Sequence, residues 1–159
     1  MTKKYTITAF SENSPGVLYR IANLLLRRKI NIESLAVSTT EKEGQSRFTI
    51  VVMADSNIIE KVVKQLYRII EVTKVYESLD EDLIYREVIL IKVSIKDSSK
   101  RREIIDIANV FKAKINIVRE DYIILQKTGR EDTIDSLVAL MEPYGIKEIV
   151  RSGRIALSR

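Results

Sequence analysis

The residues best suited to chemistry lie in a short turn near the start of the chain, Asn13-Ser14-Pro15-Gly16. The turn leads into a helical pattern, with Ser14 as the predicted N-cap and Pro15 at the first helical position. The first N–H groups of a helix lack intrahelical partners and, together with the helix dipole, attract a carboxylate. Gly16 allows close approach to the backbone, and the Asn13 amide both donates and accepts hydrogen bonds. The turn therefore predicts either a site for a small carboxylate-bearing ligand or a capped turn that binds nothing.

The composition argues against a catalytic chain. There is no Cys and no His, so a thiol nucleophile, a Cys-ligated metal and imidazole acid–base chemistry are all excluded. We expect no catalytic residues and no metal site. The glycines are too widely spaced for a dinucleotide or phosphate-binding loop; they are Gly16, Gly44, Gly129, Gly145 and Gly153.

The charge and hydropathy patterns indicate the expected compartment and the classes of partner. The net charge is +5, but the 27 basic residues are interspersed with 22 acidic ones, which favours a solvated surface over a nucleic-acid site. The basic start of the chain lacks the apolar core of a signal peptide, and no apolar run is long enough to cross a membrane. We expect a cytoplasmic protein without a membrane or nucleic-acid partner.

A long-range repeat sets the expected architecture. Ile-Ala-Asn at residues 21–23 returns at 107–109, and Lys-Ile-Asn-Ile at 29–32 returns at 114–117. Apolar periodicity predicts the order β-α-β-β-α-β in each copy. The predicted strands are 3–10, 31–40, 47–54, 72–79, 87–95, 114–119, 122–128 and 146–150, with helices opening near residues 15, 57, 98 and 133. This order predicts an α+β protein of two tandem ferredoxin-like plaits, residues 1–79 and 80–159, joined at Asp80-Glu81-Asp82.

The copies differ where a ligand is expected. At the place that matches the first turn, the second copy reads Ser98-Ser99-Lys100-Arg101-Arg102, without Asn or Gly. The ligand turn is therefore expected in the first copy only.

Asn31 begins the second predicted strand, and its apparent repeat, Asn116, suggests a partly structural role. If the second strands of two protomers paired at their edges, Asn31 would face the Asn13 turn of the other protomer.

The third predicted strand has apolar residues on both faces, because Val51 and Met53 alternate with Phe48, Ile50 and Val52. This pattern predicts a sheet surface buried against another domain or subunit. The alternative is an ordinary strand with scattered exposed apolar residues.

Several segments resemble the small regulatory subunit of acetohydroxyacid synthase, also called acetolactate synthase. Asn13–Leu18 and Arg27–Leu35 are similar to the ACT domain of that family, and Arg86–Val93 and Gly145–Arg159 are similar to its second domain. One departure is Lys29, where the family commonly has a Gly that ends the helix in a left-handed conformation. Lysine adopts that conformation at a cost of about 1 kcal/mol.

The resemblance implies a non-catalytic subunit. It implies an ACT domain at residues 1–79 for effector binding and dimerisation, followed by a C-terminal ferredoxin-like domain at 80–159. The implied partner is a catalytic large subunit that carries thiamine diphosphate, FAD and magnesium, so this chain would carry no cofactor. The small subunit would activate that enzyme and confer feedback inhibition by valine in branched-chain amino acid biosynthesis.

The resemblance also implies an effector site between two protomers. Asn13, Ser14, Pro15, Gly16, Val17 and Leu18 would come from one protomer, and Asn31 and Ile32 from the other. The alternative function is a stand-alone amino-acid-sensing ACT protein with a different partner.

Overall fold

The computed structural model describes residues 1–159, which form two compact units. The first comprises Met1–Tyr85 together with Arg154–Arg159, and the second comprises Arg86–Gly153. The sequence placed the division after residue 79. In the structure Asp80–Asp82 forms a short 3-10 turn, η1, that stays with the first unit. Because the tail also belongs to the first unit, the second unit is an insertion between two segments of the first.

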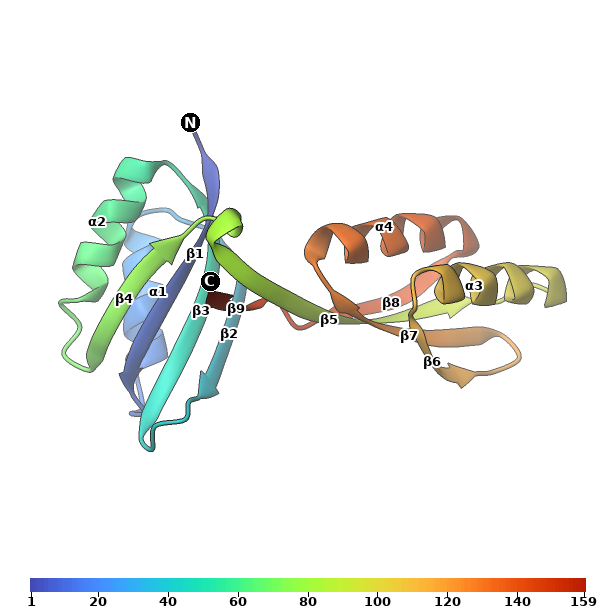
Figure 1. The fold of residues 1–159 in the computed structure, drawn as a ribbon, viewed down its shortest axis with the longest axis horizontal. Coiled ribbons are helices and arrows are strands. Elements are labelled where there is room, and N and C mark those ends of the chain that lie inside the picture. The colour runs from blue at the N-terminus through green and yellow to red at the C-terminus, as the bar shows by residue number, and fades with distance from the viewer. The chain divides into compact units, whose positions relative to one another are not determined.

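The first unit is a four-stranded antiparallel sheet with two helices on one face (Figure 1). Its strand order is β2-β3-β1-β4. The elements are β1 (Lys3–Glu12), α1 (Val17–Arg27), β2 (Ile32–Thr39), β3 (Gln45–Ala54), α2 (Ser56–Leu66) and β4 (Val72–Ser78). This architecture confirms the predicted βαββαβ plait.

The core of the first unit lies between the sheet and its helices. Alternate residues of β1 and β3 point toward the helices, as the period of two in a strand requires. Every third or fourth residue of α1 and α2 packs against these strand residues. The central members are Ile7, Ala9, Phe48, Ile50, Val52, Val17, Ile21, Leu25, Ile59, Val62 and Leu66.

The other face of this sheet is covered by the tail of the same chain. The fully buried Arg154 guanidinium lies 2.6 Å from Asp80 Oδ1 and 3.0 Å from Thr6 Oγ1 on β1. It also stacks 4.0 Å from the centroid of the Tyr85 ring. Arg47 of β3 donates a hydrogen bond to the Ala156 carbonyl at 2.7 Å. These contacts hold strand β9 (Ile155–Ser158) and the start of β5 (Leu83–Ser94) on the first unit.

Val51 is buried as predicted, but its cover is the tail of the same unit rather than another domain or subunit. Val51 is 2% exposed because it shares its face of the sheet with Thr6, which Arg154 contacts. Met53, nearer the end of β3, stays 43% exposed.

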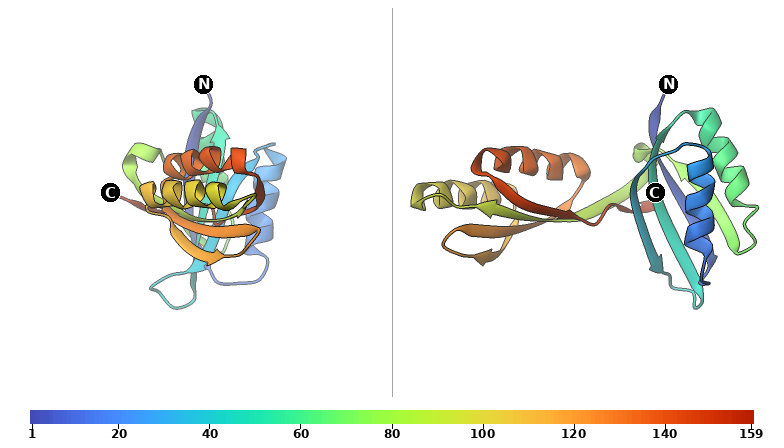
Figure 2. Two further views of the ribbon diagram at one scale, coloured as in Figure 1. Left: turned by 90° about the vertical axis from the view of Figure 1, so that its right-hand side faces the viewer. Right: turned by 180° about the vertical axis from the view of Figure 1, so that it is seen from behind.

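The second unit repeats the plait with a shorter central hairpin (Figure 2). Its strand order is β6-β7-β5-β8, with α3 and α4 on one face. The elements are β5, α3 (Ser98–Val110), β6 (Lys114–Val118), β7 (Tyr122–Gly129), α4 (Glu131–Met141), the 3-10 turn η2 (Glu142–Tyr144) and β8 (Ile146–Arg151). The core is formed mainly by Ile89, Ile91, Val93, Ile104, Ala108, Ile123, Leu125, Ile134, Leu137 and Met141.

The first helices of the two copies end in the same way. Each closes with a left-handed lysine, Lys29 at φ 56° and Lys112 at φ 55°. In α1, Lys29 and Ile30 donate to the carbonyls of Leu26 and Leu25, and in α3, Lys112 and Ala113 donate to those of Asn109 and Ala108. This is the Schellman pattern of helix termination. Lys29 therefore corresponds to Lys112, which confirms the left-handed conformation expected at Lys29.

This correspondence overturns the pairing of Asn31 with Asn116. Counting on from the two lysines, Asn31 corresponds to Lys114, and Asn116 corresponds to Glu33. Glu33 and Asn116 each lie at a β-bulge, where the pairing with the neighbouring strand shifts register. The repeated residues were misleading because the shift is three residues in the helix and two in the strand, and each shift keeps the apolar face of its element.

Two predicted helix starts are wrong. The N-cap of α1 is Gly16 rather than Ser14, and α2, expected to open near residue 57, has its N-cap at Asp55. In addition, α2 ends at Leu66, and Ile70 beyond it is 95% exposed.

Candidate functional site

The turn between β1 and α1 is held in place by two neighbouring connections. The N–H of Asn13 donates to the Gly44 carbonyl in the β2–β3 hairpin at 2.8 Å. The N–H of Glu12 donates to the Glu71 carbonyl, just before β4, also at 2.8 Å. These bonds fix the backbone of the turn and do not use the side chain of Asn13. That side chain is exposed and available to a ligand.

The N-terminus of α1 is open to an anion. Its N-cap, Gly16, has φ 87° and offers no side chain, and the first turn contains no acidic residue. The first main-chain bond of the helix runs from Arg20 N–H to the Gly16 carbonyl, so the preceding N–H groups have no intrahelical acceptor. These donors and the helix dipole favour a carboxylate at this position.

The N-terminus of α3 is already filled by a carboxylate of its own chain. Asp97 is the N-cap, and its Oδ1 accepts from Lys100 N–H at 2.9 Å and from Ser99 Oγ at 2.6 Å. The Ser99 hydroxyl and then the Lys100 N–H lower the pKa of Asp97 below its ordinary value. The two units therefore differ at this point, because the N-terminus of α3 has a side-chain cap and that of α1 has none.

Val17 and Leu18, which follow Gly16, differ in what they can offer to a ligand. Val17 is buried in the core, so it can offer a ligand only its N–H, whereas the Leu18 side chain is exposed. Arg20 lies on the next turn, where its Nη1 is 4.0 Å from the position that a Cβ on Gly16 would take. Arg20 forms an ion pair with Glu71, which ties the first turn of α1 to the connection before β4.

Asn31 lies at the opposite end of the sheet from Asn13. Ile32 is level with Tyr5 through their shared partner Val52, whereas the Asn13 turn follows Ser11 and Glu12 at the far end of β1. That separation is about 20 Å along the strand at 3.3 Å per residue. Asn31 is exposed, and Ile32 packs partly against the core. One chain therefore does not bring Asn13 and Asn31 together.

β2 is an edge strand of the first sheet. Its outer N–H and C=O groups are free to pair with another strand. Antiparallel pairing of β2 with β2 of a second protomer would reverse the strand direction across the seam. The Asn31 end of one protomer would then lie beside the Asn13 end of the other, as an isologous interface requires.

Three residues that position the turn were not anticipated from the sequence. They are Gly44, Glu71 and Arg20, and none of them was among the predicted site residues. Gly44 and Glu71 act through carbonyl groups, which sequence patterns do not reveal. Of these features, only the glycine at position 44 is visible in the sequence, and in the structure it has φ 73°.

No group of three or more acidic, His or Cys side chains is placed to hold a metal ion. None of the helices is both long and apolar enough to span a lipid bilayer.

Comparison with known families gives two matches that together span most of the chain. Residues 7–74 match the family described as the AHAS small subunit-like ACT domain. Residues 86–159 match the family described as the small subunit of acetolactate synthase.

Individual relatives match over nearly their full lengths. A probable acetolactate synthase small subunit of Archaeoglobus fulgidus is 46% identical over 156 residues, covering 98% of this chain and 97% of the relative. The acetolactate synthase small subunit of Aquifex aeolicus is 41% identical over 157 residues, covering 99% and 82%. The crystal structure of the acetolactate synthase small subunit from Thermotoga maritima has a TM-score of 0.90 at 33% identity, covering 99% of this chain and 98% of that one.

Proposed function

This chain belongs to the family of acetolactate synthase small subunits, and from that premise we propose that it regulates a catalytic large subunit. It performs no chemistry itself. It raises the activity of the large subunit and makes that enzyme sensitive to valine, in the biosynthesis of branched-chain amino acids. Thiamine diphosphate, FAD and magnesium belong to the large subunit, and the assembly works in the cytoplasm.

The proposed effector site lies at the seam between two first units paired through β2. The open N-terminus of α1 receives the α-carboxylate of valine through its free N–H groups. The Asn13 amide and the partner's Asn31 bind the polar groups of the ligand, while Leu18 and the partner's Ile32 border its side chain. Ser14 and Pro15 shape the turn. The observation that supports this proposal most directly is the uncapped N-terminus of α1, set against the Asp97-capped N-terminus of α3.

Regulation requires more than binding. Valine inhibits only if it binds the less active assembly more tightly than the active one, since an effector with equal affinity for both states shifts nothing. Bridging the two protomers provides such a difference, because any movement at the seam changes the distance between Asn13 and the partner's Asn31.

Calorimetry with valine and the isolated small subunit tests the site. We expect Asn13→Ala and Asn31→Ala each to weaken valine binding about tenfold, the loss of a hydrogen bond to a charged ligand. Asn109→Ala, an exposed position on α3, is the matched control and should bind as the parent protein does. Unchanged affinity in both site variants would mean that valine binds elsewhere.

Reconstitution with the purified large subunit tests the regulatory role. Adding the small subunit should raise the rate of acetolactate formation, and valine should then lower it. A small subunit that neither binds the large subunit nor changes its rate contradicts the proposed function.

A further inference from the structure

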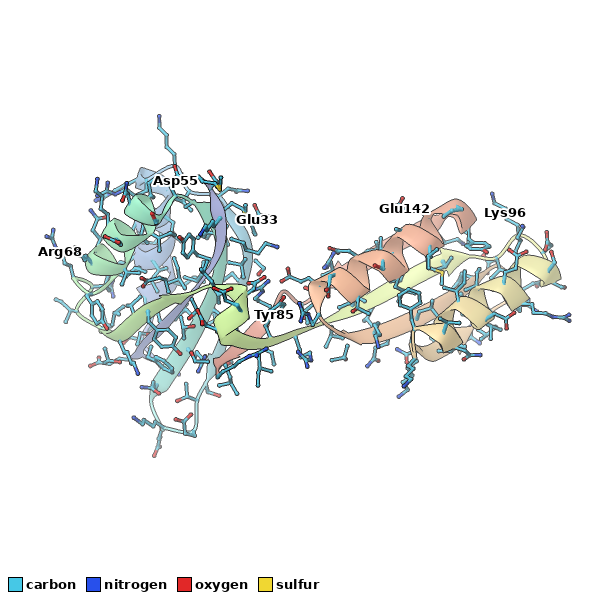
Figure 3. All side chains as sticks on the ribbon, turned by 45° about the horizontal axis from the view of Figure 1, so that its top comes forward. Glu33, Asp55, Arg68, Tyr85, Lys96 and Glu142 are labelled. Carbon is cyan, nitrogen blue, oxygen red and sulfur yellow. The ribbon has the colours of Figure 1, made fainter.

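A cationic groove runs between α1 and α2 on the helical face of the first unit. The groove has a volume of about 590 Å³ and is lined by four arginines, Arg20, Arg27, Arg28 and Arg68, with no carboxylate among the lining residues. Leu24 and Ile69 provide apolar surface within it. Figure 3 shows Arg68 just beyond the end of α2, at the outer side of the unit.

Three of the four arginines of this groove have no acidic partner. Arg20 is paired with Glu71, and Arg28 donates only to the neutral side-chain oxygen of Gln65 at 3.2 Å. Arg27 and Arg68 form no ion pair. Arg154, by contrast, is buried against Asp80. The groove therefore presents guanidinium groups whose forked geometry suits carboxylates of another molecule.

Large exposed apolar side chains adjoin the lining residues of the groove in the sequence. Tyr19, Asn23 and Leu26 follow one another at helical spacing on α1, and Asn23 lines the groove. Tyr19 is 73% exposed and Leu26 72% exposed, and Ile70, next to Ile69, is exposed almost completely. Arginine together with aromatic and large aliphatic residues is the composition of a protein interface rather than of a metabolite pocket.

Two other surfaces of the first unit are already assigned. The open face of its sheet is covered by η1, Tyr85 and β9 of the same chain. The β2 edge is the seam of the proposed dimer. The helical face is thus the broad surface that remains for a third element of the assembly.

We propose that the α1–α2 groove is the docking surface for an acidic segment of the catalytic large subunit. Carboxylates of that segment pair with Arg27, Arg28 and Arg68, and an apolar side chain packs beside Leu26 and Ile70. This inference rests on the proposed function, because it needs the large subunit as the partner.

The same helix connects the groove to the effector turn. α1 begins at the Gly16 turn, and Arg20 both lines the groove and approaches Gly16. A ligand that shifts the first turn of α1 therefore also shifts one wall of the docking surface. Coupling of two sites through one rigid element needs no additional pathway.

The test compares affinities of full-length variants for the purified large subunit at low and high salt. Arg27→Glu/Arg68→Glu should weaken association at least about tenfold at low salt, with a smaller difference at high salt, because reversed charges are screened. Arg102→Glu/Arg119→Glu makes the same change of net charge in the second unit and should associate as the parent protein does. Ile70→Ser should weaken association at both salt concentrations, whereas Val110→Ser, also highly exposed, should not.

The controls separate the ways in which the proposal can fail. If the parent small subunit does not bind the large subunit, the proposed function itself is wrong. If the parent binds and the Arg27/Arg68 variant binds equally well, only the groove is wrongly assigned. Loss of the homodimer in sedimentation assigns the groove to a second copy instead. Loss of inorganic pyrophosphate binding, with association unchanged, assigns it to a small phosphate-bearing ligand.

Discussion

Gly16 is the residue on which the geometry of the proposed effector turn depends most. Its φ of 87° lies in the left-handed region, which residues with a Cβ avoid. There is space for a Cβ, since the nearest atom, Arg20 Nη1, lies 4.0 Å away. The requirement for glycine therefore comes from backbone conformation and not from a steric clash.

Replacing Gly16 by alanine should cost stability and effector binding together. We expect Gly16→Ala to lower the free energy of unfolding by about 1 kcal/mol, the cost of a left-handed alanine. Valine affinity should also fall, because the turn relaxes away from the N–H groups that it presents. Thermal unfolding and calorimetry measure the two effects.

Gly145→Ala provides the comparison in the second unit. Gly145 has φ 93° and lies far along the chain from the effector turn, so this variant should lose stability while valine affinity stays unchanged. If both variants lose valine affinity equally, the role assigned to Gly16 is wrong.

At the scale of elements, the two equivalent helices α1 and α3 differ in how their N-termini are satisfied. Asp97 supplies α3 with a charged cap, whereas α1 has none. Since a capped helix end cannot also receive a ligand carboxylate, the proposed effector site is possible at α1 and not at α3.

The Asp97 cap predicts a pH dependence of stability. The pKa of Asp97 is lowered in the folded protein by Ser99 and Lys100, so the folded state favours the carboxylate. The stabilisation is complete above the ordinary value of 3.8 and is lost as pH falls through the lower folded pKa. Asp97→Ala should therefore lower Tm at neutral pH, and its Tm should approach that of the parent protein in acid. Asp106→Ala, an exposed change on the same helix, should show no such convergence.

The sequence predicted the elements well because their apolar periods are regular. The strand–helix order of both copies followed from residues such as Ile7, Ile50, Ile91 and Leu125, which are buried as expected. The exact starts of the helices were harder to predict from the sequence. Ser14 and Asn57 resemble caps, but the helix starts are set by the left-handed Gly16 and by Asp55.

In the candidate site too, features set by neighbouring residues could be predicted from the sequence, and contacts between residues distant in the sequence could not. The Asn13–Gly16 turn could be proposed from the sequence because carboxylate recognition by a helix end depends on residues that are neighbours in the chain. Its anchors at Gly44 and Glu71 are distant in sequence and act through backbone carbonyls. The α1–α2 groove was missed because Arg68 meets Arg20 and Arg27 only after folding.

At the scale of the whole molecule, the second unit is an insertion whose two ends belong to adjacent parts of the first. Tyr85 precedes it and Arg154 follows it, and their side chains are in contact. The first unit is therefore complete only with residues from both sides of the insertion.

A shortened chain tests this arrangement. Joining residues 1–85 to 154–159 through a short Gly-Ser linker should give a protein that unfolds cooperatively, because Arg154 still reaches Asp80 and Thr6. A chain of residues 1–79 should be less stable, since it leaves the face around Val51 uncovered. Circular dichroism during heating measures both. Equal stability of the two chains would show that the tail is not part of the first unit.

The position of Asn13 and Asn31 at opposite ends of one sheet has a consequence for cellular control. On the proposed pairing, a lone protomer holds only half of each site, and every dimer holds two by symmetry. Effector affinity then depends on protein concentration, and the effector in turn favours dimerisation by mass action. A cell that makes too little of this subunit would lose feedback at a fixed valine level, so the amount of the sensor sets its threshold.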